Sequence, residues 1–458
     1  MYNFYFNEIS NHYEMMEMVR VFLPIGTYKI LNEDPWVTGE GTWADLLVRI
    51  PDGMKDRNQG KRYLYEYLSE YTGIKPDWGI LTGVRPVKLV GELFLQTRSQ
   101  EQVKEILLKE YLLSEKKANL LLEIWRTQQE ILDDENEKEV GLYIGIPFCP
   151  TRCVYCSFPS YPILSANVTD YLGALKKEIA YVGMEMARRN WYPESLYIGG
   201  GTPTALDEKG LKEILDQVND YFDLTKAKEY TVEAGRPDTI TPTKLNLIRS
   251  SGGGRISINP QSMNEETLKR IGRAHKPEDI LRGFQIAREE GQFIINADLI
   301  AGLPGEDTED FAESLSSIIR LKPENITVHT LAVKRASRLK EMDRDYSYHQ
   351  GKAVRAMLNN GSALLTEAGY RPYYLYRQKQ MTGNFENVGY ALPGTESLYN
   401  IKIMEENQTI IAMGAGGISK VWYPKENRLE RVPNVSNYEI YIERIDEMLE
   451  RKRKGIFQ

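Results

Sequence analysis

The run Gly141-Leu-Tyr-Ile-Gly-Ile-Pro-Phe-Cys-Pro-Thr-Arg-Cys-Val-Tyr-Cys-Ser-Phe158 contains all three cysteines of a 458-residue chain. Cys149, Cys153 and Cys156 have the spacing C-x-x-x-C-x-x-C. Thiolates are soft ligands that suit iron–sulfur clusters and zinc. Three thiolates on one short loop can hold three irons of a [4Fe–4S] cluster and leave the fourth iron open. A small molecule can chelate that open iron, and S-adenosylmethionine (SAM) is the candidate.

Two other uses of these cysteines fit the sequence less well. A disulfide framework would have an even, dispersed set of cysteines. A structural zinc ion takes four ligands, commonly as two spaced pairs, and none of the four histidines of the chain lies near the cysteine loop in the sequence. We therefore predict that the three cysteines bind a [4Fe–4S] cluster.

The composition indicates a soluble globular protein. Hydrophobic residues make up 41% of the chain, and the net charge of -7 gives no general nucleic-acid footprint. The chain does not open with a signal-peptide pattern, and no stretch approaches the roughly 20 apolar residues that span a bilayer. Because cluster-binding thiols require a reducing compartment, we expect a cytoplasmic protein without a membrane span.

Between about residues 141 and 330 the chain alternates short β-branched runs with amphipathic helical stretches. Six such βα units predict a parallel sheet with right-handed crossovers. Eight units are needed to close a full barrel, so we expect an open, partial (β/α)6 barrel in an α/β protein. The expected strands are Leu142–Ile146, Ser195–Ile198, Tyr230–Glu233, Arg255–Ile258, Phe293–Ile300 and Ile326–Thr330, and the expected helices include Thr169–Arg189, Glu208–Phe222, Lys276–Glu290 and Asp307–Leu321.

The segments on either side of this core look separate. We expect an N-terminal accessory α/β domain over 1–138, with a polar helical region over Ser99–Glu137, and a core domain over 139–345. The third region, 346–458, is expected to be an α+β extension. It would contain a helix over Lys352–Glu367, a tyrosine-rich stretch and a final helix over Asn437–Lys454.

In sheets of this kind, ligands bind at the carboxyl ends of the strands. Residues that can carry chemistry follow five of the expected strands: Cys149, the run Gly199-Gly-Gly-Thr-Pro-Thr, Glu233, Gln261 and Asp298. The glycine run offers backbone that a ligand can approach closely, with N–H groups free to donate to the methionyl end of SAM, or it could be an ordinary glycine turn.

The two acids at strand ends allow two interpretations. A buried carboxylate is costly unless something pairs with it. Glu233 and Asp298 could bind ribose hydroxyls, an ammonium group or a sulfonium, or each could form a salt bridge with an arginine such as Arg236 or Arg255.

Several other residues also have a functional and a structural interpretation. Arg273 could clamp a carboxylate bidentately or form a surface ion pair. His275 and His329 could donate protons or be hydrogen-bonded structural histidines. The aromatic and cationic side chains of the tyrosine-rich stretch suit a flat, polyanionic ligand, but they also fit a half-buried strand. These side chains are Tyr373, Tyr374, Tyr376, Arg377, Lys379 and Tyr390, and Lys334, Arg335, Arg338 and Lys340 could add positive potential at the same rim.

The chain resembles radical SAM enzymes, and specifically the HemN-like branch of oxygen-independent coproporphyrinogen III oxidases (dehydrogenases) and their relatives. The matching motifs are the lead-in Tyr-Ile-Gly-Ile-Pro-Phe-Cys (143–149), the cysteine spacing with an aromatic residue before the last cysteine, Gly-Gly-Gly-Thr-Pro-Thr (199–204) and Asp-Leu-Ile-x-Gly-Leu-Pro (298–304). Outside them, Leu-Thr-Gly-Val-Arg-Pro-Val-Lys (81–88), Tyr-Arg-Gln-Lys (376–379) and Glu-Asn-Val-Gly-Tyr (386–390) resemble HemZ-type members.

This resemblance implies a radical SAM barrel with [4Fe–4S] on the three cysteines and SAM on the open iron. It implies that Tyr143 and Tyr155 line the SAM site. It also implies that SAM is held by Gly200, Gly201, Thr202, Glu233, Gln261, Arg273 and Asp298.

The implied activity is that of a radical SAM oxidoreductase in haem biosynthesis, which converts two propionates of coproporphyrinogen III to the vinyl groups of protoporphyrinogen IX. A flavodoxin or ferredoxin-type electron donor is implied as partner. Two departures bear on the substrate: Gly145 replaces a histidine often found in the lead-in, and Ser157-Phe158 replaces an x-Cys pair. Haem ring opening, methyl transfer to a heteroaromatic ring and a haem chaperone function remain open.

Overall fold

The computed structural model describes residues 2–6, 12–24, 26–33, 46–50, 56–132, 136–332, 350–378 and 384–458. The predicted basic residues Lys334, Arg335, Arg338, Lys340 and Lys379 lie outside these ranges. None of the helices within them is long and apolar enough to cross a membrane.

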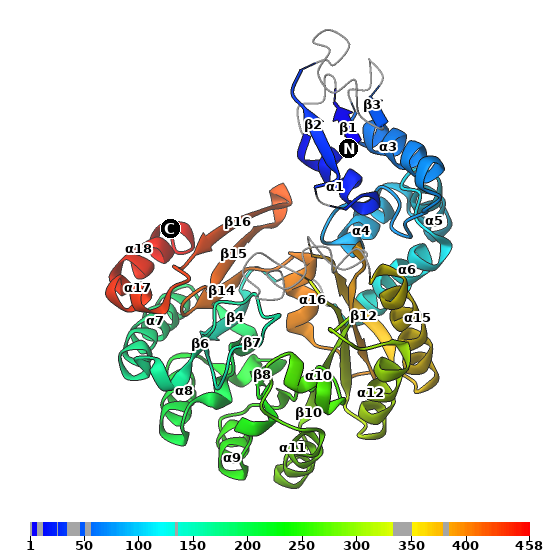
Figure 1. The fold of residues 1–458 in the computed structure, drawn as a ribbon. Helices are drawn as coiled ribbons and strands as arrows, with labels where there is room; N and C mark the ends of the chain where they lie inside the picture. Colours follow the sequence, from blue (N-terminus) through cyan, green and yellow to red (C-terminus); the bar gives the residue numbers. More distant parts are fainter. Residues whose placement is uncertain are drawn as a thin grey trace.

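The centre of the protein is an open sheet of eleven strands, and its middle is the predicted run of six parallel strands (Figure 1). The strands follow the order β12-β13-β11-β10-β9-β8-β7-β4-β14-β15-β16, so β12 and β16 are the two edges. The partial barrel is confirmed. Its six strands are β4 (Glu139–Ile146), β7 (Tyr192–Gly200), β8 (Glu229–Glu233), β9 (Arg255–Ser257), β10 (Ile294–Ala301) and β11 (Asn325–Thr330).

Alternation along the strands decides what each face of the sheet carries. Leu142, Ile144 and Ile146 of β4 are fully buried in the large core, whereas the intervening Tyr143 is half-buried on the opposite face. Helices cover the apolar face and surround the sheet in Figure 1. They are α7 (Val168–Arg188), α8 (Glu208–Tyr221), α9 (Pro242–Ser250), α11 (Pro277–Glu290), α12 (Thr308–Arg320) and α15 (Gly351–Glu367).

The C-terminal region extends the core sheet at both edges, which the sequence pattern did not predict. β13 (Asn387–Ala391) runs antiparallel beside β11, with β12 (Arg371–Tyr376) beyond it. β14 (Ile410–Met413) runs parallel to β4 and is followed by β15 (Ile418–Tyr423) and β16 (Arg428–Pro433). The helix α16 (Leu398–Glu405) connects the two groups, and the expected final helix is two helices, α17 (Tyr438–Glu443) and α18 (Ile445–Gly455).

The N-terminal region contains two packing units. A parallel sheet of β2 (Tyr28–Leu31), β1 (Tyr2–Tyr5) and β3 (Leu46–Arg49) packs with α1 (His12–Phe22) and α3 (Arg57–Thr72) around a core of its own. In contrast, α4 (Pro86–Thr97), α5 (Gln100–Lys109) and α6 (Glu115–Ile131) contribute to the large core. We therefore propose that the first domain ends near residue 80 rather than at 138.

Candidate functional site

The cysteine loop follows β4 and is fixed by neighbours from distant parts of the chain. A short strand β5 (Phe148–Cys149) pairs with β6 (Tyr161–Pro162), which places Cys149 opposite Pro162. Further along the loop, the Val154 N–H donates to Ile271 O at 3.0 Å. These bonds hold the loop over the carboxyl ends of the parallel strands, where ligands were expected.

The three thiols are suited to bind one iron–sulfur cluster together. All are free and half-buried. Burial raises the pKa of Cys149, and Cys156 and Cys153 raise it further, while the hydroxyl of Thr202, 3.6 Å from the sulfur, lowers it. In the described chain, no three His, Cys, Asp or Glu side chains are close enough to share one metal ion. A cluster distributes its thiolates over separate irons, so the arrangement suits a cluster better than a single zinc ion.

The glycine run packs directly against the lead-in to the cysteines. Gly200 has φ +110°, and a Cβ on Gly201 would lie 2.6 Å from Phe148 O. The Gly201 N–H donates to Ile146 O and the Thr202 N–H to Phe148 O, both at 2.8 Å. The prediction that the N–H groups of this run are free to bind a ligand is therefore wrong for Gly201 and Thr202. The glycines instead allow two strand ends to approach closely.

Glu233, at the end of β8, has no cationic partner among the described residues. Its Oε1 accepts a hydrogen bond of 2.6 Å from the Tyr197 hydroxyl. Burial raises the pKa of Glu233 to about 7, against the opposing effect of the Tyr197 hydrogen bond. A cationic ligand beside this carboxylate would favour its ionised form.

Asp298, in β10, is paired with Thr327 of β11, and its carboxylate lies near the side chain of His329. Asn296 donates to Asp298 Oδ1 at 2.7 Å, and His329 Nε2 is 3.5 Å from Oδ2. Burial alone would raise the pKa of Asp298, but His329 and the hydrogen bonds hold it below its ordinary value. The two arginines considered as partners for these acids are engaged elsewhere: Arg236 pairs with Asp238 and Arg255 lies near Glu229.

Gln261 and Arg273 carry buried polar atoms without hydrogen-bond partners. Gln261 has φ +67°, extends β9 alongside β10, and leaves its Oε1 unpartnered. Arg273 is buried and does not form the surface ion pair that was one expectation. It donates to Asn259 O at 2.5 Å and to the Tyr155 hydroxyl at 3.4 Å. Its Nε has no hydrogen-bond partner. Buried polar atoms normally have partners, so these atoms fit a polar ligand at the cysteine loop.

Aromatic side chains line the inner face of the open barrel. Tyr143 stacks on Tyr197 at 6.3 Å between ring centroids, and Tyr197 stacks on Tyr399 of α16 at 4.7 Å. Sequence reasoning missed Tyr197 and Tyr399. The period-two pattern could have placed Tyr197 beside Tyr143 from the neighbouring strand, but only the tertiary structure brings Tyr399 to this face.

The tyrosine-rich stretch forms the edge hairpin of β12 and β13. Tyr373, Tyr374 and Tyr390 are buried there. The structure supports the strand interpretation, but the strands are buried rather than half-buried. Tyr376 reaches the site, with its hydroxyl 3.2 Å from His329 Nδ1. His275 is buried without a hydrogen-bond partner, and burial lowers its pKa to about 4, so it is neutral at physiological pH.

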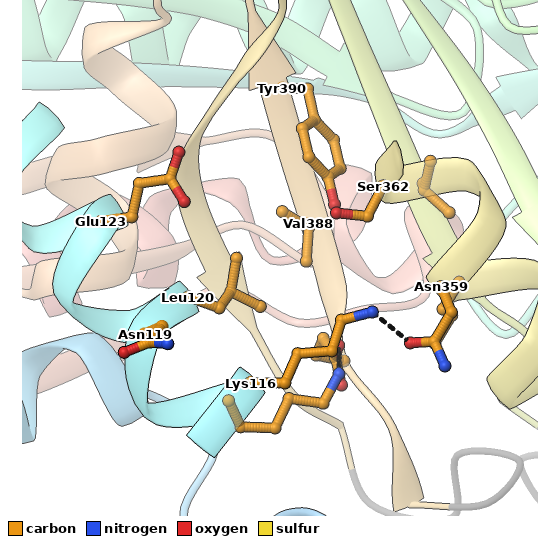
Figure 2. Close-up of a pocket in the computed structure, with 12 residues that line it drawn as sticks. Lys116, Asn119, Leu120, Glu123, Asn359, Ser362, Val388 and Tyr390 are labelled. Carbon is orange, nitrogen blue, oxygen red and sulfur yellow. Dashed lines mark hydrogen bonds and ion pairs between the residues drawn. The ribbon is translucent and has the colours of Figure 1, made fainter. Parts of the chain in front are cut away.

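A separate cavity of about 230 Å³ lies on the outer side of the sheet, between α6 and α15 (Figure 2). Val328 and Val388 line it together with Lys116 and Asn359, whose side chains form a hydrogen bond of 2.7 Å. Because Val328 alternates with His329 along β11, this cavity is on the opposite face from the cysteine loop and is distinct from the site.

The geometry of the site agrees with the protein family and the relatives that this chain resembles. The model of the radical SAM superfamily matches residues 143–318. The oxygen-independent coproporphyrinogen-III oxidase-like protein HemZ of Bacillus subtilis is 42% identical over 402 residues, which cover 86% of this chain and 80% of that protein. The heme chaperone HemW of Escherichia coli is 30% identical over 291 residues, which cover 62% of this chain and 71% of that protein.

The solved structure of Escherichia coli coproporphyrinogen III oxidase (HemN), described as a radical SAM enzyme, aligns with a TM-score of 0.55 and 25% identity. The alignment covers 68% of this chain and 70% of that one. Its fold supports the open barrel, and the cysteine loop lies within residues 143–318, the segment that the superfamily model matches. The chain therefore belongs to the HemN-like family of the radical SAM superfamily, whose members bind a [4Fe–4S] cluster and SAM.

Proposed function

We propose that the protein is a cytoplasmic radical SAM enzyme that converts propionate side chains of coproporphyrinogen III to the vinyl groups of protoporphyrinogen IX. The observation that carries this proposal is the grouping of three thiols with Glu233 and Asp298 at one end of an open barrel. The similarity to HemZ and HemN supports the substrate class.

In this proposal Cys149, Cys153 and Cys156 hold the cluster, and Thr202 donates a hydrogen bond to the first of these sulfurs. The bound cofactors supply the radical chemistry that breaks an unactivated C–H bond. SAM is held by Glu233, Asp298 and the residues with unpartnered polar atoms. The set of proposed SAM-site residues is Tyr143, Tyr155, Gly200, Gly201, Thr202, Glu233, Gln261, Arg273 and Asp298. Gly200, Gly201 and Thr202 shape this site through the close approach of two strand ends, because the N–H groups of Gly201 and Thr202 are already bonded.

The protein residues bind and orient the reactants. Glu233, once ionised, places negative charge beside the cationic parts of SAM, and the stacked Tyr143, Tyr197 and Tyr399 exclude water from the inner face. On the substrate, a hydrogen atom leaves the propionate carbon next to the pyrrole ring. Carbon dioxide then leaves, one electron passes to a separate one-electron acceptor, and a vinyl group remains. A flavodoxin or ferredoxin-type protein would supply the reducing electron.

A haem chaperone is the second candidate. The similarity to heme chaperones named HemW favours it, as does Gly145 in place of the lead-in histidine of many oxidases. Such a protein would bind haem stably and would not turn over SAM.

The test is anaerobic incubation of the iron-loaded protein with SAM, a chemical reductant and coproporphyrinogen III, followed by mass analysis. We expect 5′-deoxyadenosine, carbon dioxide and protoporphyrinogen IX, and we expect Cys153→Ala to abolish all three. Deoxyadenosine without protoporphyrinogen would reject this substrate, and parallel incubations with haem would then detect a ring-opened or methylated product. Stable haem binding without deoxyadenosine would support the chaperone.

A further inference from the structure

A buried carboxylate far from the cysteines connects the N-terminal region to the site. Glu386, just before β13, is 2% exposed. Its Oε2 accepts a hydrogen bond of 2.8 Å from the indole N–H of Trp78, and its Oε1 pairs with the ammonium of Lys117 on α6. Trp78 and Lys117 are buried as well. The N-terminal region therefore supplies both side-chain partners of this carboxylate.

The backbone beside Glu386 holds the end of β11. The Thr330 hydroxyl donates to Glu386 O at 2.7 Å, and the Thr330 N–H donates to Asn387 Oδ1 at 2.8 Å. Thr330 directly follows His329, whose imidazole faces Asp298. A shift of Glu386 would therefore move the backbone that carries His329.

The same N-terminal segment also holds the residue that follows Tyr376. The Arg377 N–H donates to Val84 O at 2.8 Å, and its guanidinium donates to Leu81 O and lies 4.8 Å from the centre of the Trp78 ring. Tyr376 in turn contacts the other nitrogen of His329. Both the backbone of His329 and its phenol neighbour are therefore anchored to residues 78–84 and 117.

We propose that residues 78–84 and Lys117 form a brace that orients His329 against Asp298. Glu386 is the positioning residue that connects this brace to the strand end that carries His329. This inference rests on the proposed role of Asp298 in SAM binding. The brace is built from buried, paired charges, which are costly to break and which fix one arrangement in space. It gives the N-terminal region a part in the site, although that region contains none of the cofactor residues.

The alternative is that Glu386 only stabilises the fold, and a matched control separates the two roles. Glu194 is also 2% exposed, and it accepts from Lys228 at 2.9 Å and Gln408 at 2.5 Å, but it lies at the amino end of β7. Glu194→Gln should lower the melting temperature as Glu386→Gln does, without changing the affinity for SAM.

The experiment measures the dissociation constant of SAM anaerobically on cluster-loaded protein, together with the melting temperature. We expect Glu386→Gln and Trp78→Phe to weaken SAM binding by about 3- to 30-fold, a size typical of coupling through packed networks. If Glu386→Gln does not fold, Trp78→Phe still tests the brace, since it removes only the indole donor.

A double-mutant cycle identifies the route. In a His329→Gln background, Glu386→Gln should cause little further loss of SAM affinity, because His329 can no longer respond. Unchanged SAM affinity in both single variants, or additive losses in the double variant, would overturn the proposal. SAM binding needs no tetrapyrrole, so failure here is distinct from failure to decarboxylate coproporphyrinogen III.

Discussion

The amino and carboxyl ends of the same parallel strands carry buried acids with different partners. At the amino ends, Glu194 accepts from Lys228 and Gln408, and Glu229 accepts from the Ser397 hydroxyl at 2.8 Å and the Leu398 N–H at 2.6 Å. At the carboxyl ends, Glu233 and Asp298 have no lysine or arginine partner within the described ranges.

This difference separates acids whose partners come from the protein from acids that we propose bind a ligand. A carboxylate removed from water requires compensation by charge or hydrogen bonds. The protein supplies that compensation at the amino ends through α16 and the segment before β14. At the carboxyl ends it does not, and burial raises the pKa of Glu233 to about 7. A cationic ligand would lower this pKa again.

The largest effect should come from breaking an amino-end acid. Glu194→Ala leaves buried Lys402 and Gln408 without their carboxylate, so we expect the free energy of unfolding to fall by about 3–5 kcal/mol. Denaturant titration measures this loss. The folded fraction should bind SAM as the parent protein does, and weakened SAM binding would contradict the division between the two ends.

The opposite pattern is expected at a carboxyl-end acid. Glu233→Gln removes the charge proposed to face SAM, so the binding free energy should weaken by about 1.5–3 kcal/mol. The free energy of unfolding should stay the same or rise, because a costly buried carboxylate is gone. Anaerobic equilibrium dialysis with labelled SAM measures the affinity. A stability loss with intact SAM binding would show that Glu233 is structural.

The smallest effect is a pH dependence of SAM binding. Because Glu233 must ionise to face a cation and its pKa is about 7, SAM affinity should increase by about tenfold per pH unit below 7 and level off above it. Tyr197→Phe removes a hydrogen bond that lowers this pKa, so the midpoint should move to higher pH. Affinities measured by dialysis from pH 5.5 to 8.5, a range of roughly three units around that pKa, test this, and Glu233→Gln should flatten the profile.

The stability of the ligand-free protein should depend on pH in the opposite direction to the affinity for SAM. The native Glu233 holds its proton more tightly than the unfolded chain, in which its pKa is about 4.5. The free energy of unfolding should therefore fall as the pH rises from about 4.5 to about 7. Burial raises the pKa of Glu306 and Glu405 to about 7 as well, so only the SAM profile isolates Glu233.

The sequence predicted the six core strands closely because their apolar periodicity is local. β8 was expected from Tyr230 and begins at Glu229, and β11 was expected from Ile326 and begins at Asn325. The helix α9 was missed, although Thr241 caps it and Pro242 opens it.

The site was predicted in part. Cys149, Glu233, Gln261 and Asp298 are at the carboxyl ends as expected, because strand direction alone fixes that edge. The use of the glycine N–H groups by Ile146 and Phe148 was not foreseen, since it depends on how closely two strands approach.

The sequence by itself predicted the ligand set for a cluster, and it determined the order of strands and helices in the open barrel and the family, because spacing and periodicity are properties of neighbouring residues. Only the tertiary structure decided which buried charges are already paired. Trp78 and Glu386 are 308 positions apart, and Glu178 pairs with Lys452 of the last helix. Such partners come from elements brought together by core packing, so local sequence patterns do not specify them.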